Sequence, residues 1–228
     1  MKLSVATDSA LVAWISYEPP GLQAVVHAVL SHGDGGTFDA VLSPALENSR
    51  LRVGATLTSD GLAAVVWLDG LNLDGDRVIL SRYSSGVWSS PETISAPPSG
   101  PLAVVSDLFI NRSATSAWWA ESTSDTRIVR ADFDGGNWTR SVVDEAAPTQ
   151  VSTPNLVVVE GPAGSTLAAF VQHPGELTVM SQGNRPGRDT FTGFLHHQPP
   201  QLAVHSDGTR WFATHSSPTA RFLVTHCP

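Results

Sequence analysis

Short runs of apolar residues, each closed by a turn signal, recur along this chain. The clearest series lies at residues 51–97, where the segments 52–59, 62–68, 77–83 and 87–94 each have the length of a strand. Asp60-Gly61 and Asp69-Gly70 close two of these runs, and such pairs accept the positive φ of a tight turn. No segment sustains the i, i+3, i+4, i+7 apolar spacing of an amphipathic helix. The pattern predicts an all-β chain of short antiparallel strands.

The same arrangement repeats about every 50 residues. An aromatic anchor in the second strand of each unit falls at Trp14, Trp67, Trp118 and Phe170, with spacings of 53, 51 and 52 residues. A second aromatic opens the fourth strand and falls at Phe38, Trp88, Trp138 and Phe191. A fixed period with four strands per unit is typical of β-propellers, whose blades bury their faces against each other.

We therefore expect a single domain with the fold of a five-bladed β-propeller and mostly four-stranded antiparallel blades. The units span residues 1–48, 49–98, 99–150, 151–199 and 200–228. The fifth unit offers three strands, at 201–206, 209–215 and 221–226, and the first unit already uses residues 1–7 as its innermost strand. The last blade should therefore remain three-stranded, be completed by a partner protein at its edge, or be where the domain continues in a longer protein.

Charge and composition narrow the classes of function. The formal net charge is −8, which argues against binding to a nucleic-acid backbone. No run of about 18 apolar residues occurs, so we expect no membrane insertion. The only cysteine, Cys227, leaves no internal disulfide, and His196-His197 would point to opposite faces of a strand, which is unfavourable for chelation. We expect no metal and no cofactor. The start of the chain lacks the features of a signal peptide. An extracellular or virion-associated location is favoured over a cytoplasmic one.

The second unit carries the residues of a family resemblance. Its pattern DG–AVVW–DRVILSRY–GVW, with a Gly-x-Trp opening of the fourth strand, resembles the sialidase-like (BNR-type) propeller repeat. The Ser-x-Asp-x-Gly-x-x-Trp box of that family is not kept, because counting back from Trp88 gives Ser81, Tyr83 and Ser85. The resemblance covers nearly the whole chain and implies an architecture. The five-fold repetition also resembles five-bladed lectins of the tachylectin type.

Four residues are candidates for ligand binding. Trp119 and Trp211 depart from the repeat, so we expect one of them to expose a ring on which a sugar could stack. Arg77 and Arg127 open third strands, and arginine forks bind carboxylates. By contrast, acids end the innermost strands at positions where turn chemistry alone would place them, namely Asp8, Asp60, Asp107, Glu160 and Asp207. No catalytic residue is assigned.

These observations favour a non-catalytic binding or interaction module. We expect it to bind carbohydrate in the manner of a lectin, or to form a structural part of a phage tail or surface assembly. The alternative is a sialidase-like glycoside hydrolase acting at the propeller axis. That enzyme would need three converging arginines, or two carboxylates about 5–9.5 Å apart.

Overall fold

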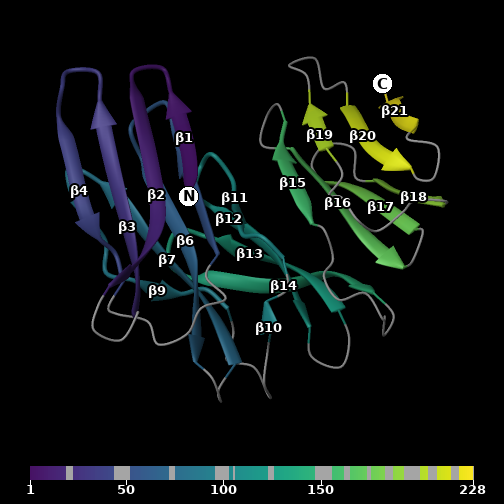
Figure 1. Cartoon of the computed structure of the whole chain (residues 1–228), viewed down its shortest axis with the longest axis horizontal. Helices are drawn as coiled ribbons and strands as arrows, with labels where there is room; N and C mark the ends of the chain where they lie inside the picture. The colour runs from purple at the N-terminus through teal and green to yellow at the C-terminus, as the bar shows by residue number, and fades with distance from the viewer. Residues whose placement is uncertain are drawn as a thin grey trace. The chain divides into compact units, whose positions relative to one another are not determined.

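The protein is built from β-strands joined by turns (Figure 1). The computed structural model describes residues 1–18, 23–43, 52–71, 75–95, 103–104, 106–122, 126–146, 156–161, 165–173, 176–182, 187–192, 201–204, 210–216 and 221–227. These residues contain no helix, so the all-β expectation is confirmed. Within this part of the chain, nothing forms a helix that is long and apolar enough to cross a membrane.

Strands that follow each other in the chain also pair with each other. The first sheet has the order β1 (Lys2–Ala6), β2 (Ser9–Glu18), β3 (Gln23–His32), β4 (Thr37–Val41). The second comprises β5 (Val53–Leu57), β6 (Ala63–Leu71), β7 (Gly75–Ser84) and β8 (Val87–Trp88), and β9 (Glu92–Thr93) also pairs with β7. The third comprises β10 (Ala103–Val104), β12 (Ser116–Ser122), β13 (Thr126–Phe133) and β14 (Trp138–Ala146), and β11 (Phe109–Ile110) also pairs with β12.

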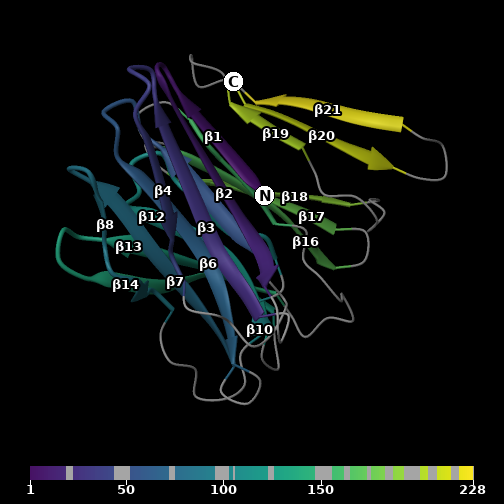
Figure 2. The same cartoon turned by 60° about the vertical axis from the view of Figure 1, so that its left-hand side comes forward.

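The last two sheets continue this antiparallel order. The fourth comprises β15 (Val157–Glu160), β16 (Thr166–His173), β17 (Glu176–Gln182) and β18 (Gly187–Thr192). The fifth comprises β19 (Gln201–Val204), β20 (Arg210–Ser216) and β21 (Arg221–Cys227), which Figure 2 shows as one sheet. Each expected unit thus supplies a sheet, and the three strands expected in the fifth unit are confirmed. A partner at the edge of β21 stays a prediction.

Two predicted strands are interrupted. The run 87–94 gives two short strands, β8 and β9, on either side of Pro91, which has no N–H for the ladder. The innermost run of the third unit likewise divides into β10 and β11. Between them, the Ser106 hydroxyl accepts a hydrogen bond from the Ala120 amide at 2.6 Å. A side chain there takes the place of a ladder partner.

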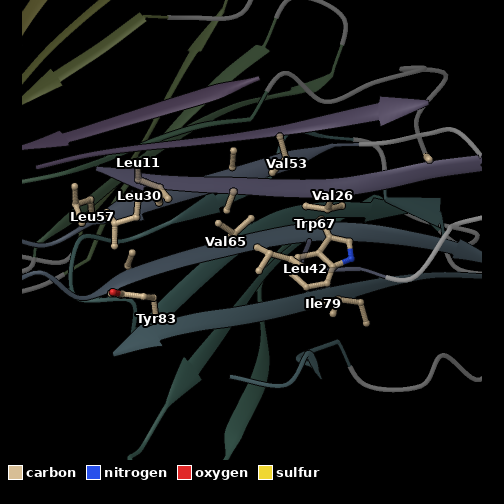
Figure 3. Close-up of a cluster of buried hydrophobic side chains, with 14 residues drawn as sticks. Leu11, Val26, Leu30, Leu42, Val53, Leu57, Val65, Trp67, Ile79 and Tyr83 are labelled. Atoms are coloured by element: carbon tan, nitrogen blue, oxygen red, sulfur yellow. The ribbon is translucent and has the colours of Figure 1, made fainter. Parts of the chain in front are cut away.

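The chain divides into two compact units, and the first contains residues 1–104, 108–118 and 129–142. Here β5 lies against β1 and β2, and β11 lies against β5 and β6. The apolar faces of the first and second sheets form one buried cluster, which includes Leu11, Val26, Leu30, Val65 and Trp67 (Figure 3). Alternation along each strand directs these residues to one face.

The second unit contains residues 105–107, 119–128 and 143–228. Here β19 lies against β15 and β16. Gly161 is needed at this contact, because a Cβ there would meet Val204 Cγ1 at 2.8 Å.

Three of the four aromatic anchors are core residues. Trp67, Trp118 and Phe170 are each about 1% exposed, which confirms the burial that their spacing predicted. Trp14 is only half-buried, and its ring stacks on His27 with 5.1 Å between centroids.

Candidate functional site

A half-exposed group of charged and aromatic side chains lies in the first of the two compact units, where β7 and β9 approach β13 and β14. Its members are Arg82, Glu92, Phe133 and Trp138. The cation, the carboxylate and the indole N–H all meet at one oxygen atom, Glu92 Oε1.

The local sequence of the second repeat, residues 49–98, brings Arg82 and Glu92 together. The Ser89 amide donates to the Arg82 carbonyl oxygen at 2.7 Å, and the Arg82 amide donates to the Ser89 hydroxyl at 3.0 Å. Pro91 then interrupts the ladder, and pairing resumes with Glu92 opposite Leu80. Because residues two apart on a strand share a face, Arg82 and the residue opposite Leu80 lie on the same side of the sheet.

The interactions of the pair are charge-assisted. Arg82 Nη2 donates to Glu92 Oε1 at 2.8 Å, and the side chains are 28% and 38% exposed, respectively. Trp138 Nε1 donates to the same oxygen at 3.0 Å. The first distance is that of a charge-assisted hydrogen bond, and the second is that of an ordinary N–H···O hydrogen bond.

The third sheet supplies the aromatic side of the group. The guanidinium carbon of Arg82 lies 3.8 Å from the centroid of the Phe133 ring and 5.7 Å from that of Trp138. The two rings are 5.4 Å apart. This geometry is a cation–π contact, which holds the guanidinium over the Phe133 ring. Phe133 and Trp138 are both half-buried, so the group is reachable from solvent.

Packing between the sheets does not require this charged pair. Trp14 lies opposite His27 and Trp67 lies opposite Ile79, so third strands align with an offset of 52 residues. By that offset, Arg82 corresponds to Leu30. Glu92 corresponds to Ala40, because Ala40 lies opposite Ala28 as Glu92 lies opposite Leu80. Leu30 belongs to the apolar core, and Ala40 packs against it. The first repeat therefore has apolar residues at the two positions where the second repeat has an ion pair.

The two tryptophans singled out in the sequence have different outcomes. Trp119 is fully buried at 0% exposed, so of the two candidates it is not the one that exposes a ring. Its Nε1 donates to the buried carboxylate of Glu121 at 3.1 Å, and residues two apart on β12 share that face. Trp211 lies on β20 opposite Ala203, and its side chain lies outside the described residues.

The two arginines singled out in the sequence lie near the start of the third strand of their repeats, as expected. Arg77 belongs to the first compact unit and Arg127 to the second. Arg77 is half-buried on β7 opposite Asp69. Arg127 is half-buried on β13. Arg77 acts on its neighbour electrostatically. Burial raises the pKa of Asp69 above its ordinary value, and the Arg77 charge partly offsets this rise.

Among the acids at the ends of the innermost strands, Asp60 serves its turn, whereas Asp107 is exposed between β10 and β11. The pKa of Asp60 is lowered by a hydrogen bond from the Thr58 side chain and by backbone N–H groups. Asp8 lies in the turn between β1 and β2, and Glu160 ends β15. Asp207 lies outside the described residues. Across the described ranges, no group of three or more His, Cys, Asp or Glu side chains could hold a metal ion.

The sequence contains a signal for this site that the repeat pattern alone does not reveal. Arg82 stands beside Tyr83, the residue that pairs with the repeat aromatic Trp88. Phe133 and Trp138 lie 50 residues beyond Tyr83 and Trp88. Arg82 stands next to these repeat aromatics at the position where the first repeat has Leu30, and this charged residue marks a departure from the repeat.

Comparisons with known proteins inform the fold. No family model and no curated protein matches the chain. Among solved structures, one from a structural and mechanistic analysis of two prolyl endopeptidases matches 99% of this chain over 32% of its own length, at 18% identity and a TM-score of 0.54. The β-propeller domain of the Trilobed protease from Pyrococcus furiosus matches 100% of this chain over 67% of its own length, at 6% identity and a TM-score of 0.54.

A lectin from Aleuria aurantia, solved with a fucosylated sugar, is also similar. It covers 96% of this chain and 74% of its own length, at 14% identity and a TM-score of 0.49. The chain thus spans about a third of the first of these structures and two thirds or more of the others. At such low identity a similarity concerns the fold alone, and the two structures with a TM-score of 0.54 support a β-propeller built from antiparallel four-stranded sheets.

Proposed function

We propose that this chain is a five-bladed propeller of the sialidase-like type that acts as a non-catalytic carbohydrate-binding module. The observation that carries the proposal is the group formed by Arg82, Glu92, Phe133 and Trp138, in which Glu92 Oε1 accepts from both Arg82 and Trp138.

The chemistry of the group suits a sugar. A pyranose presents C–H faces that pack on aromatic rings and hydroxyls that bond to planar charged groups. The half-buried rings of Phe133 and Trp138 offer the first kind of surface, and the partly exposed Arg82–Glu92 pair offers the second. Binding sites combine a mostly apolar lining with a few fixed polar groups in this way.

The site is also held in advance of binding. Ser89 fixes the backbone of Arg82 through two hydrogen bonds, and Phe133 fixes the guanidinium. A rigid site loses less conformational entropy when a ligand binds. An ion pair at a position where the first unit uses Leu30 and Ala40 is therefore better explained by recognition than by packing.

A glycoside hydrolase receives less support from the acids near the inner strands. A general acid works best with a pKa raised toward the working pH. Asp60 has its pKa lowered by the hydrogen bonds of its turn, which is the opposite direction. This acid is suited to closing a hairpin.

A glycan array probed with the full chain, together with a panel of fluorogenic glycosides, tests the proposal. We expect binding to a subset of glycans without hydrolysis. The variant Arg82→Ala/Glu92→Ala should lose binding while keeping the circular dichroism spectrum of the parent. Asp132→Asn is the matched control, because Arg130 and Asp132 form a pair of similar exposure, 30% and 42%, on β13. Hydrolysis of a glycoside, or equal binding by the double variant, would contradict the proposal.

A further inference from the structure

We infer that the Arg82–Glu92 site selects a neutral sugar with two adjacent hydroxyls and rejects sugars that carry a carboxylate. The inference rests on the proposed carbohydrate-binding function and names the class of ligand for that site. It departs from what a sialidase-like repeat would suggest, since a sialidase recognises an acidic sugar through converging arginines.

One carboxylate oxygen of Glu92 accepts hydrogen bonds from protein groups, and the other is available to a ligand. Oε1 accepts from Arg82 Nη2 at 2.8 Å and from Trp138 Nε1 at 3.0 Å, whereas Oε2 takes part in no hydrogen bond with the described residues. An ionised carboxylate can only accept hydrogen bonds. A ligand group that reaches Oε2 must therefore be a donor, and a sugar hydroxyl is one.

Arg82 provides the complementary group. One N–H of its Nη2 binds Glu92, and its guanidinium carbon lies over the Phe133 ring, 3.8 Å from the ring centroid. The remaining N–H groups lie in the guanidinium plane and can only donate. A second hydroxyl, adjacent to the first, can accept from Arg82 while the first donates to Glu92. Two vicinal hydroxyls thus match an acceptor and a donor that lie side by side.

A ligand carboxylate does not fit this arrangement. It cannot donate to Glu92 Oε2, and its charge would lie beside the charge of Glu92, which is already in contact with the only cation that the group contains. Arg140, two positions beyond Trp138 on β14, is the next cation along that strand, and it has interactions of its own. Burial also lowers the pKa of Arg140, which means that its surroundings disfavour its charge. A site that binds the carboxylate of an acidic sugar in a bidentate manner would need a guanidinium whose charge no protein carboxylate neutralises.

Isothermal titration of the full chain with two sets of probes tests the inference. The neutral set contains the methyl glycosides of mannose, galactose and fucose, and the acidic set contains the methyl glycosides of glucuronic acid and N-acetylneuraminic acid. We expect at least one neutral probe to bind, and to bind tenfold or more tightly than either acidic probe. Removing one of the two adjacent hydroxyls, as in the corresponding deoxy glycoside, should weaken that binding tenfold or more.

The variant Glu92→Gln separates recognition from folding. The amide keeps the shape of the side chain and can keep one acceptor toward Arg82 and Trp138, but it places a donor where the open acceptor was. We expect Glu92→Gln to lose binding of the neutral probe tenfold or more with an unchanged melting temperature, and the control Asp132→Asn to bind like the parent.

Each result has one meaning. Tighter binding of an acidic probe than of any neutral probe would overturn the inference and leave the proposed function standing. Unchanged neutral binding by Glu92→Gln would also overturn it. Failure of the chain to bind any glycoside or array glycan would overturn the proposed function itself, and the inference with it.

Discussion

Gly54 on β5 approaches the backbone of Leu108 so closely that no side chain fits between them. A Cβ built on Gly54 would lie 2.7 Å from the Leu108 carbonyl oxygen and 2.8 Å from Val66 Cγ1. Both strands that flank this contact belong to the first unit, where β11 lies against β5. The second and third sheets can approach here only because residue 54 has no Cβ.

We therefore expect Gly54→Ala to destabilise the protein by about 1–3 kcal/mol, as overpacking of a core does. The clash involves backbone, which cannot rotate away as a side chain can. Urea unfolding followed by circular dichroism measures the change. Gly136→Ala is the control, because a Cβ there would meet only Asp134 Oδ1, at an ordinary 3.7 Å. Equal stability of the two variants would show that the strands can separate without cost.

Trp67 fills the space between the first and second sheets. It is about 1% exposed and belongs to the cluster in Figure 3. Replacing it with alanine removes most of a large side chain from a packed core, which costs about 3–5 kcal/mol. Val87→Ala on β8, where the side chain is 68% exposed, should change stability little. A neutral Trp67→Ala in denaturant unfolding would mean that this face of the second sheet is not a core.

The repeat predicted the strands and the core better than it predicted the site. Trp67, Trp118 and Phe170 could be identified as core residues because period and strand alternation together fix which side chains must be buried. Trp119 was misjudged because its departure from the repeat suggested exposure, whereas both faces of an inner strand are covered. Its indole N–H is satisfied by Glu121, a partner that no periodicity reveals. The Arg82–Glu92 pair depends on the interruption at Pro91, which apolar patterning does not detect.

The buried hydrogen bond between Trp119 and Glu121 should stabilise the second unit. In Trp119→Phe, the carboxylate of Glu121 loses its indole donor while the ring remains. Loss of a partner from a buried polar group costs about 1–3 kcal/mol. A double-mutant cycle with Glu121→Met, which removes the acceptor, should give a coupling of about 0.5 kcal/mol or more. Additive single changes would show that the 3.1 Å contact contributes nothing to stability.

The outer edge of β21 should be open to a further strand. β21 pairs with β20 on one side, and no other strand of the described part pairs with it. Amide groups on the open side of an edge strand lack a ladder partner. In the isolated monomer we expect alternate amides of residues 221–227 to exchange with deuterium much faster than the amides of β17, which pairs on both sides. Uniformly slow exchange along β21 would show that its edge is already covered.

Asp69 and Arg77 lie opposite each other on β6 and β7 and should give the stability a pH dependence. Burial raises the pKa of Asp69 above its ordinary 3.8, and the charge of Arg77 lowers it again in part. A carboxyl whose pKa is higher in the folded state than in the unfolded state binds its proton more tightly when folded. Its ionisation therefore costs stability as pH rises through the raised pKa. Replacing Arg77 removes the charge that offsets this rise.

We therefore expect Arg77→Met to raise the pKa of Asp69 further and to destabilise the protein more at pH 7 than at a pH well below the ordinary 3.8, where Asp69 is protonated in the folded and the unfolded state. Carboxyl carbon shifts in NMR titrations report the pKa, and urea unfolding at several pH values reports the stability. Because the asparagine side chain does not titrate, the pH dependence of the Arg77→Met effect should disappear in an Asp69→Asn background. If the effect of Arg77→Met has the same size at both pH values in the parent, Arg77 acts through packing of its aliphatic stem and not through its charge.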